Sequence, residues 1–137
     1  MLLTGATRGI GRALCNLLVA EGVTVLAVAR DAAALEELAQ GGRGQIVALP
    51  CDLSLAAQRR ALTGRVAAEY ASLGGLINNA GIQAKMAFFR PSAGGRAEAI
   101  AAEIEVNLTA PLHLSTELLP PLAALSPRLP QRLLRGG

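Results

Sequence analysis

Three closely spaced glycines near the amino terminus, Gly5, Gly9 and Gly11, have a spacing that could bind a phosphate group. They follow a short apolar run and precede a segment whose apolar residues recur every three or four positions. The first glycine permits a tight turn after a strand, the second lets backbone approach a bulky ligand, and the third allows close helix packing. Because the first amides of a helix lack partners and carry partial positive charge, we predict a pyrophosphate site here. Its residues are Gly5, Thr7, Arg8, Gly9, Ile10 and Gly11.

The loop alone does not define the ligand. Its Gly-x-x-x-Gly-x-Gly spacing differs from the Gly-x-Gly-x-x-Gly dinucleotide fingerprint. Glycines that only form a turn and the start of a helix, without binding a ligand, could give the same sequence pattern. No Gly-Lys-Ser/Thr follows the loop, which excludes a P-loop nucleotidase.

The end of the second predicted strand favours one dinucleotide over another. A carboxylate there holds the ribose 2′-hydroxyl of NAD, whereas an arginine suits the 2′-phosphate of NADP. The strand ends at Arg30, and Arg8 in the glycine loop supplies a second cation for the same phosphate. Asp31 could instead accept from a ribose hydroxyl and favour NAD, although it equally suits the start of a helix. The pattern favours NADP over NAD.

Strand and helix patterns alternate along the chain, which predicts a parallel sheet with helices on both sides. Apolar residues 23–29 are typical of a strand buried on both faces. The first helix is predicted to bury one stripe of residues spaced three and four apart, namely Ile10, Ala13, Leu14, Leu17 and Leu18. Further strands are predicted at 45–49 and 75–78, and further helices at 31–42, 54–73 and 97–119.

The character of the chain changes after residue 119. Along the last predicted helix, apolar residues recur at intervals of four: Ile100, Ile104, Leu108 and Leu112. Four of the seven prolines follow it, and no fifth strand is evident. We therefore predict one α/β unit over residues 1–119, which ends after about four strands and a long helix, and an irregular Pro/Arg/Gly-rich tail over residues 120–137.

Composition narrows the possible functions. The 137 residues suit one domain, and 52% hydrophobic against 17% charged residues excludes a disordered chain. The net charge of +3 comes from three arginines in the tail, so the rest of the chain has no basic surface for nucleic acid. The sequence lacks a membrane-length apolar run and a signal-peptide pattern, so we expect a cytoplasmic protein. The two cysteines lack metal-type spacing, and no metal is expected.

Four motifs together resemble the short-chain dehydrogenase/reductase family. They are TGATRGIG over 4–11, CDL over 51–53, NNAG over 78–81 and VNL over 106–108, in the family's order and spacing. The resemblance covers about 2–119, the amino-terminal half of the family's domain, and implies a Rossmann-type, doubly wound parallel sheet. It also implies that Asp52 and Leu53 lie by the adenine and that Asn79, Ala80 and Gly81 border the ribose next to the nicotinamide. From the residues alone, Asp52 could equally cap a helix and the two asparagines could form a turn.

Asn107 is a candidate for a supporting catalytic role. Pro111 lies four residues later and has no N–H, so the Asn107 carbonyl loses its usual helical partner. The resemblance implies that this carbonyl holds a water of a proton relay; a simple proline kink facing solvent is the alternative.

The rest of the family's catalytic machinery is not present in this sequence. The resemblance implies hydride transfer between NAD(P)H and a small carbonyl or alcohol, with Tyr-x-x-x-Lys and a serine at the reacting oxygen. Tyr70 and Lys85 are the only tyrosine and lysine, and they do not form that motif. We therefore expect no activity from the chain alone, and interpret it as a frameshifted or prematurely ended reading frame.

Three functions remain open at this stage: the cofactor half of an oxidoreductase, a non-catalytic NADP-binding module, or a gene fragment without function. The fourth strand would be an unpaired edge, so we also expect self-association.

Overall fold

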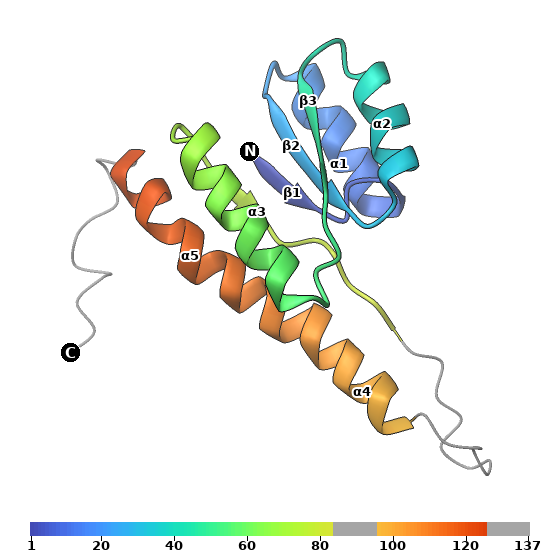
Figure 1. Cartoon of the computed structure of the whole chain (residues 1–137). Coiled ribbons are helices and arrows are strands. Elements are labelled where there is room, and N and C mark those ends of the chain that lie inside the picture. The colour runs from blue at the N-terminus through green and yellow to red at the C-terminus, as the bar shows by residue number, and fades with distance from the viewer. Residues whose placement is uncertain (84–95, 126–137) are drawn as a thin grey trace.

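Four parallel strands form the sheet of the computed structural model, which describes residues 1–83 and 96–125. The strand order is β3-β2-β1-β4, which confirms the predicted Rossmann-type half-sheet (Figure 1). The strands in chain order are β1 (Leu2–Thr4), β2 (Val25–Ala29), β3 (Ile46–Pro50) and β4 (Leu76–Ile77).

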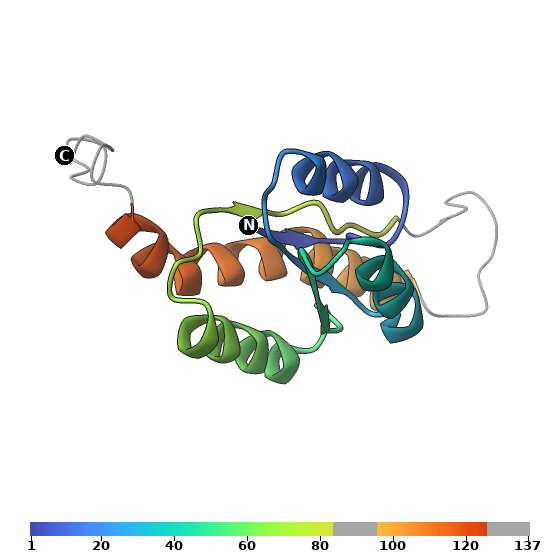
Figure 2. The same cartoon turned by 90° about the horizontal axis from the view of Figure 1, so that it is seen from above.

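Helices cover both faces of this sheet. Alternate residues of β2 enter different cores: Leu26 and Val28 pack with α3 and α5, whereas Val25 and Ala27 pack with α1 and α2. Figure 2 shows α1 and α3 on opposite sides of the strands. Burial on both faces explains why β2 is almost wholly apolar. The helices in chain order are α1 (Gly9–Ala20), α2 (Ala32–Gly41), α3 (Ala56–Glu69), α4 (Arg96–Ile104), the π-helical η1 (Glu105–Thr109) and α5 (Ala110–Leu125).

The buried face of α1 differs from the predicted stripe. Ile10 and Leu17 are 80% and 64% exposed, whereas Gly11 and Cys15 are buried. Gly11 brings the helix close to the sheet, and this contact selects the row that includes Cys15. The prediction for Ile10, Ala13 and Leu17 was therefore wrong, because periodicity alone did not identify which side faces the sheet.

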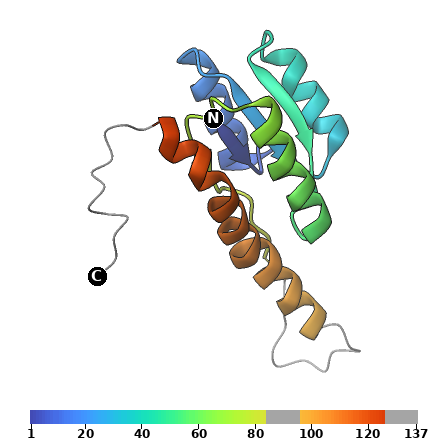
Figure 3. The same cartoon turned by 60° about the vertical axis from the view of Figure 1, so that its left-hand side comes forward.

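The predicted long helix consists of α4, η1 and α5, which form one continuous rod beside α3 (Figure 3). The N–H of Ala110 donates to the carbonyl of Glu105, five residues back, as in a π-helix. The apolar row that recurs at intervals of four in the sequence is exposed: Ile100, Ile104, Leu108 and Leu112. A second row with the same spacing packs against the core instead, namely Val106, Ala110, Leu114 and Leu118.

The helix also extends beyond its predicted end. α5 continues to Leu125, through the two prolines at 120 and 121, so the predicted boundary after residue 119 lies too early. Leu122 packs against the same core as Leu114 and Leu118, and this contact favours continued helix. Residues 84–95, between the fourth predicted strand and the last predicted helix, and the remaining tail, 126–137, lie outside the described residues. Within the described part of the chain, the helices are too short or too polar to cross a membrane.

Candidate functional site: a crevice at the carboxyl edge of the sheet

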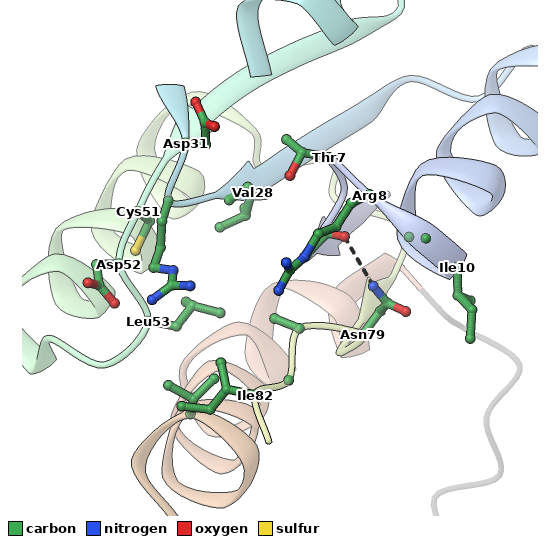
Figure 4. Close-up of a pocket in the computed structure, with 18 residues that line it drawn as sticks. Thr7, Arg8, Ile10, Val28, Asp31, Cys51, Asp52, Leu53, Asn79 and Ile82 are labelled. Carbon is green, nitrogen blue, oxygen red and sulfur yellow. Dashed lines mark hydrogen bonds between the residues drawn. The ribbon is translucent and has the colours of Figure 1, made fainter. Parts of the chain in front are cut away.

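A crevice of about 840 Å³ opens where the strands end. Its volume is within the range of small-molecule sites, about 300–1,000 Å³. Figure 4 shows Thr7 and Arg8 on one side, with Cys51, Asp52 and Leu53 facing them. The structure brings every predicted cofactor residue to this crevice: Gly5, Thr7, Arg8, Gly9, Ile10, Gly11, Arg30, Asp52, Leu53, Asn79, Ala80 and Gly81.

Two glycines give the loop between β1 and α1 its shape. A Cβ on Gly11 would lie 2.0 Å from the carbonyl oxygen of Gly5, so a side chain there would collide with the loop. Gly9 has φ +53°, which favours glycine, and a Cβ there would meet no protein atom within 4 Å. The predicted close packing at Gly11 is therefore present, and the backbone at Gly9 faces open space.

The first turn of α1 has no side-chain cap. Arg8 is the N-cap residue, its side chain makes no capping hydrogen bond, and the first turn contains no acidic residue. The N–H of Arg12 is bonded to the carbonyl of Arg8, as expected inside a helix. The preceding amides are those that a helix leaves for an external acceptor, and they lie at the crevice.

Two arginines lie along the crevice with no salt bridge to any carboxylate in the described ranges. Arg8 and Arg30 are both exposed, and both line the crevice. Asp31, the residue that could have favoured NAD, caps α2: its Oδ1 accepts from the N–H of Ala34 at 3.0 Å. The structure therefore gives Asp31 the capping role that was one of its two interpretations.

Asp52 organises the turn that follows β3. Its Oδ1 accepts from the N–H and hydroxyl of Ser54 at 2.9 and 2.7 Å. Burial raises the pKa of the Asp52 carboxyl, but the bonds from Ser54 and the charge of Arg30 outweigh burial, so the pKa is lowered overall. Asp52 is not the N-cap of the next helix, α3, because Leu55 occupies that position. An ionised Asp52 therefore fixes one wall of the crevice.

Cys51, next to Asp52, is buried and lines the same wall. Burial and the charge of Asp52 raise the pKa of its thiol to about 11, against the opposing effect of Arg59. The thiol is therefore protonated at neutral pH and is a poor nucleophile.

The loop after β4 is tied to the glycine loop. The Nδ2 of Asn79 donates to the carbonyl of Thr4 at 3.1 Å and to that of Gly5 at 3.2 Å. The bond to Gly5 is the dashed line in Figure 4. The buried hydroxyl oxygen of Thr4 accepts from the N–H groups of Asn79 and Ala80, both at 3.0 Å. Asn79 thus holds the glycine loop in place, a role that the sequence analysis did not predict.

Asn107 lies beside the crevice, in η1. Its side chain pairs with the backbone of Ile82: Oδ1 accepts from the N–H at 2.9 Å and Nδ2 donates to the carbonyl at 2.7 Å. The neighbouring Val106 and Ile82 line the crevice, whereas Asn107 does not. The π turn, which was not predicted, ends shortly before Pro111, and the water-holding role of the Asn107 carbonyl stays a prediction.

Asp31, which was the alternative contact for a ribose, also lines the crevice. Five further lining residues were not predicted, namely Val28, Ala29, Cys51, Ile82 and Val106. Each lies within two residues of a predicted site residue or of Asn107, so their closeness to the predicted motifs was the available signal. In the described part of the chain, no group of three or more histidine, cysteine or acidic side chains could hold a metal ion.

The half-sheet, its flanking helices and the crevice at its carboxyl edge define a Rossmann-type α/β protein. The short chain dehydrogenase family model matches residues 1–127, so the chain belongs to this family.

Known proteins of this kind are similar along most of the chain. The uncharacterized oxidoreductase DltE of Bacillus subtilis is 37% identical over 124 residues, which cover 89% of this chain and 47% of that protein. The Pseudomonas aeruginosa RhlG/NADP active-site complex is 31% identical with a TM-score of 0.80, over 90% of this chain and 48% of that one. A short-chain dehydrogenase from Sphingobium yanoikuyae in complex with NADPH is 34% identical with a TM-score of 0.75, over 87% and 46%.

The chain spans less than half the length of the curated relatives that it matches.

Proposed function

We propose that this chain is the cofactor-binding half of an NADP(H)-dependent oxidoreductase that interconverts a carbonyl and an alcohol by hydride transfer. The observation that carries the proposal is the pair of arginines, Arg8 and Arg30, that line the crevice without a salt bridge to a described carboxylate. Two such cations suit the dianionic 2′-phosphate that distinguishes NADP from NAD. The complexes of RhlG with NADP and of the Sphingobium enzyme with NADPH support the same cofactor.

The other crevice residues support this cofactor along its length. The open backbone at Gly9 and the uncapped amides of α1 would hold the pyrophosphate. Asp52 and Leu53 would contact the adenine, and Asn79, Ala80 and Gly81 the ribose next to the nicotinamide. NADPH supplies the hydride when bound.

A titration with NADPH and NADH, read as thermal unfolding, tests the cofactor. NADPH should raise the unfolding temperature more than NADH does, because a ligand that binds only the folded chain stabilises it in proportion to its affinity. Arg30→Gln and Arg8→Gln should weaken NADPH binding about tenfold each, as expected for a lost charged phosphate contact, and leave NADH unchanged. Arg12→Gln is the control, because Arg12 pairs with Glu37 instead. Equal stabilisation by both nucleotides would contradict the NADP assignment and favour NAD.

We also propose that these 137 residues do not catalyse turnover by themselves. Tyr70 packs against the core between α3 and α5 and does not line the crevice, and the sequence holds no Tyr-x-x-x-Lys. No tyrosine phenol is therefore placed to exchange a proton with a substrate oxygen. Oxidation of NADPH by the purified chain with a carbonyl substrate would contradict this proposal. Cofactor binding without turnover would support a binding module, and an unfolded chain that ignores NADPH would support a fragment without function.

Self-association is proposed from the exposed apolar surface. β4 is an edge of the described sheet, and the exposed row on α4, η1 and α5 adds Ile100, Ile104, Leu108 and Leu112. Sedimentation at micromolar concentration should therefore show a mass above that of one chain, and a monomer would refute the proposal.

A further inference from the structure

Arg59 on α3 is a buried cation outside the crevice lining. It is 3% exposed, and the other polar residues buried to this degree in the described ranges are two threonines, Thr4 and Thr63. Burial of a charge is unfavourable unless partners compensate it, so the contacts of Arg59 carry unusual weight.

The guanidinium of Arg59 joins two separate segments. Its Nη1 donates to the backbone carbonyl of Leu53, and its Nη2 forms an ion pair with Oε1 of Glu105. The third nitrogen, Nε, has no hydrogen-bond partner in the described part of the chain. The fork of an arginine can hold two acceptors at a fixed separation, which an ammonium cannot do.

Both partners of Arg59 belong to segments that form walls of the crevice. Leu53 lines it from the turn after β3, and Glu105, which does not line it, begins η1 and immediately precedes Val106, which does. We propose that Arg59 is a positioning residue that sets the separation of these two walls, and thereby the affinity for the nicotinamide dinucleotide. This inference rests on the proposed function.

A purely structural ion pair would behave differently from a positioning one. When both partners of a buried pair are replaced by neutral residues, folding stability is often retained, because both desolvated charges are lost together. The double variant Arg59→Met/Glu105→Gln removes both charges and also leaves the Leu53 carbonyl without its donor. A positioning role therefore predicts that stability and cofactor affinity separate in this variant.

The experiment measures NADPH affinity by calorimetry, well below the unfolding temperature, and stability by urea denaturation of the same samples. The double variant should unfold near the wild-type midpoint and bind NADPH at least tenfold more weakly. Arg59→Lys keeps the charge but cannot bridge both acceptors. It should remain folded and bind NADPH threefold to tenfold more weakly than wild type. This variant tests the proposal even if the double variant does not fold. Arg65→Met is the matched control: its partner on the same helix, Glu69, forms an exposed pair away from the crevice, so both readouts should stay at wild-type values.

The outcomes separate the two proposals. Folded Arg59 variants with wild-type affinity would overturn the positioning role and leave NADPH binding intact. A wild-type chain that folds and does not bind NADPH would overturn both.

Discussion

The two helices that begin at the ends of β1 and β2 start in opposite ways. The N-cap of α2 is Asp31, whose carboxylate accepts from the N–H of Ala34 at 3.0 Å. The N-cap of α1 is Arg8, which makes no side-chain capping hydrogen bond, and neither helix has an acidic residue in its first turn. Both N-caps line the same crevice. One helix therefore has a side-chain cap at its first turn, and the other has none.

We interpret this difference as stability given up for the cofactor binding proposed above. An arginine at a helix start places a positive charge beside the positive end of the helix dipole, which is unfavourable in the absence of an anion. Locally unfavourable choices of this kind are concentrated at functional sites. The capped start of α2 provides the internal reference, because it belongs to the same sheet edge and follows a neighbouring strand.

The largest expected effect comes from filling the close contact at Gly11. Gly11→Ala should destabilise the chain by about 3 kcal/mol or more, because the new methyl would lie 2.0 Å from the Gly5 carbonyl oxygen. Gly64→Ala is the matched control inside α3, where a Cβ meets no atom within 4 Å; it should stabilise by about 0.5–1 kcal/mol. Urea denaturation compares the two. Equal effects would mean that the glycine loop does not depend on close packing.

The same regions show how far the sequence could predict the structure. Motif order and strand composition were sufficient for the sheet and for every predicted cofactor residue at the crevice, because carboxyl ends of parallel strands share one edge. Periodicity failed on the last helix, where two apolar rows share the spacing of four and only packing against the core distinguishes Leu114 from Leu112. The burial of Arg59 was not predictable either, since arginine is usually exposed and its partner Glu105 is distant in sequence.

A smaller effect is expected at the capped start. Asp31→Ala should cost about 1 kcal/mol of unfolding free energy, because the N–H of Ala34 loses its acceptor. Asp31→Ser keeps a capping oxygen and should remain within a few tenths of a kcal/mol of wild type, so the pair separates capping from charge. In the NADP interpretation, Asp31→Ser leaves NADPH affinity unchanged or improves it, because a negative charge is removed near the 2′-phosphate. A marked loss of affinity for NADH in Asp31→Ser would instead assign Asp31 to a ribose contact. The start of α2, and not only that of α1, would then take part in binding.

The smallest expected effect is the pH dependence of stability that comes from the turn after β3. This turn belongs to the start of neither α1 nor α2. The lowered pKa of Asp52 means that its ionised form is favoured by folding. Its contribution is therefore fully present above the ordinary carboxyl pKa, about 4, and is lost as pH falls through the lower folded value. Solvent screening limits it to about 1 kcal/mol or less.

Urea denaturation between pH 7 and pH 3 measures this contribution as the difference between wild type and Asp52→Asn. The difference should shrink below about pH 4, since protonation then removes from the wild type the charge that the variant already lacks. Ser54→Ala removes the hydroxyl that donates to Asp52 at 2.7 Å and should weaken the same pH dependence while the carboxylate remains. If the Asp52→Asn difference stayed constant down to pH 3, the carboxylate would not be what holds this wall, and its place opposite Arg8 would depend on backbone contacts alone.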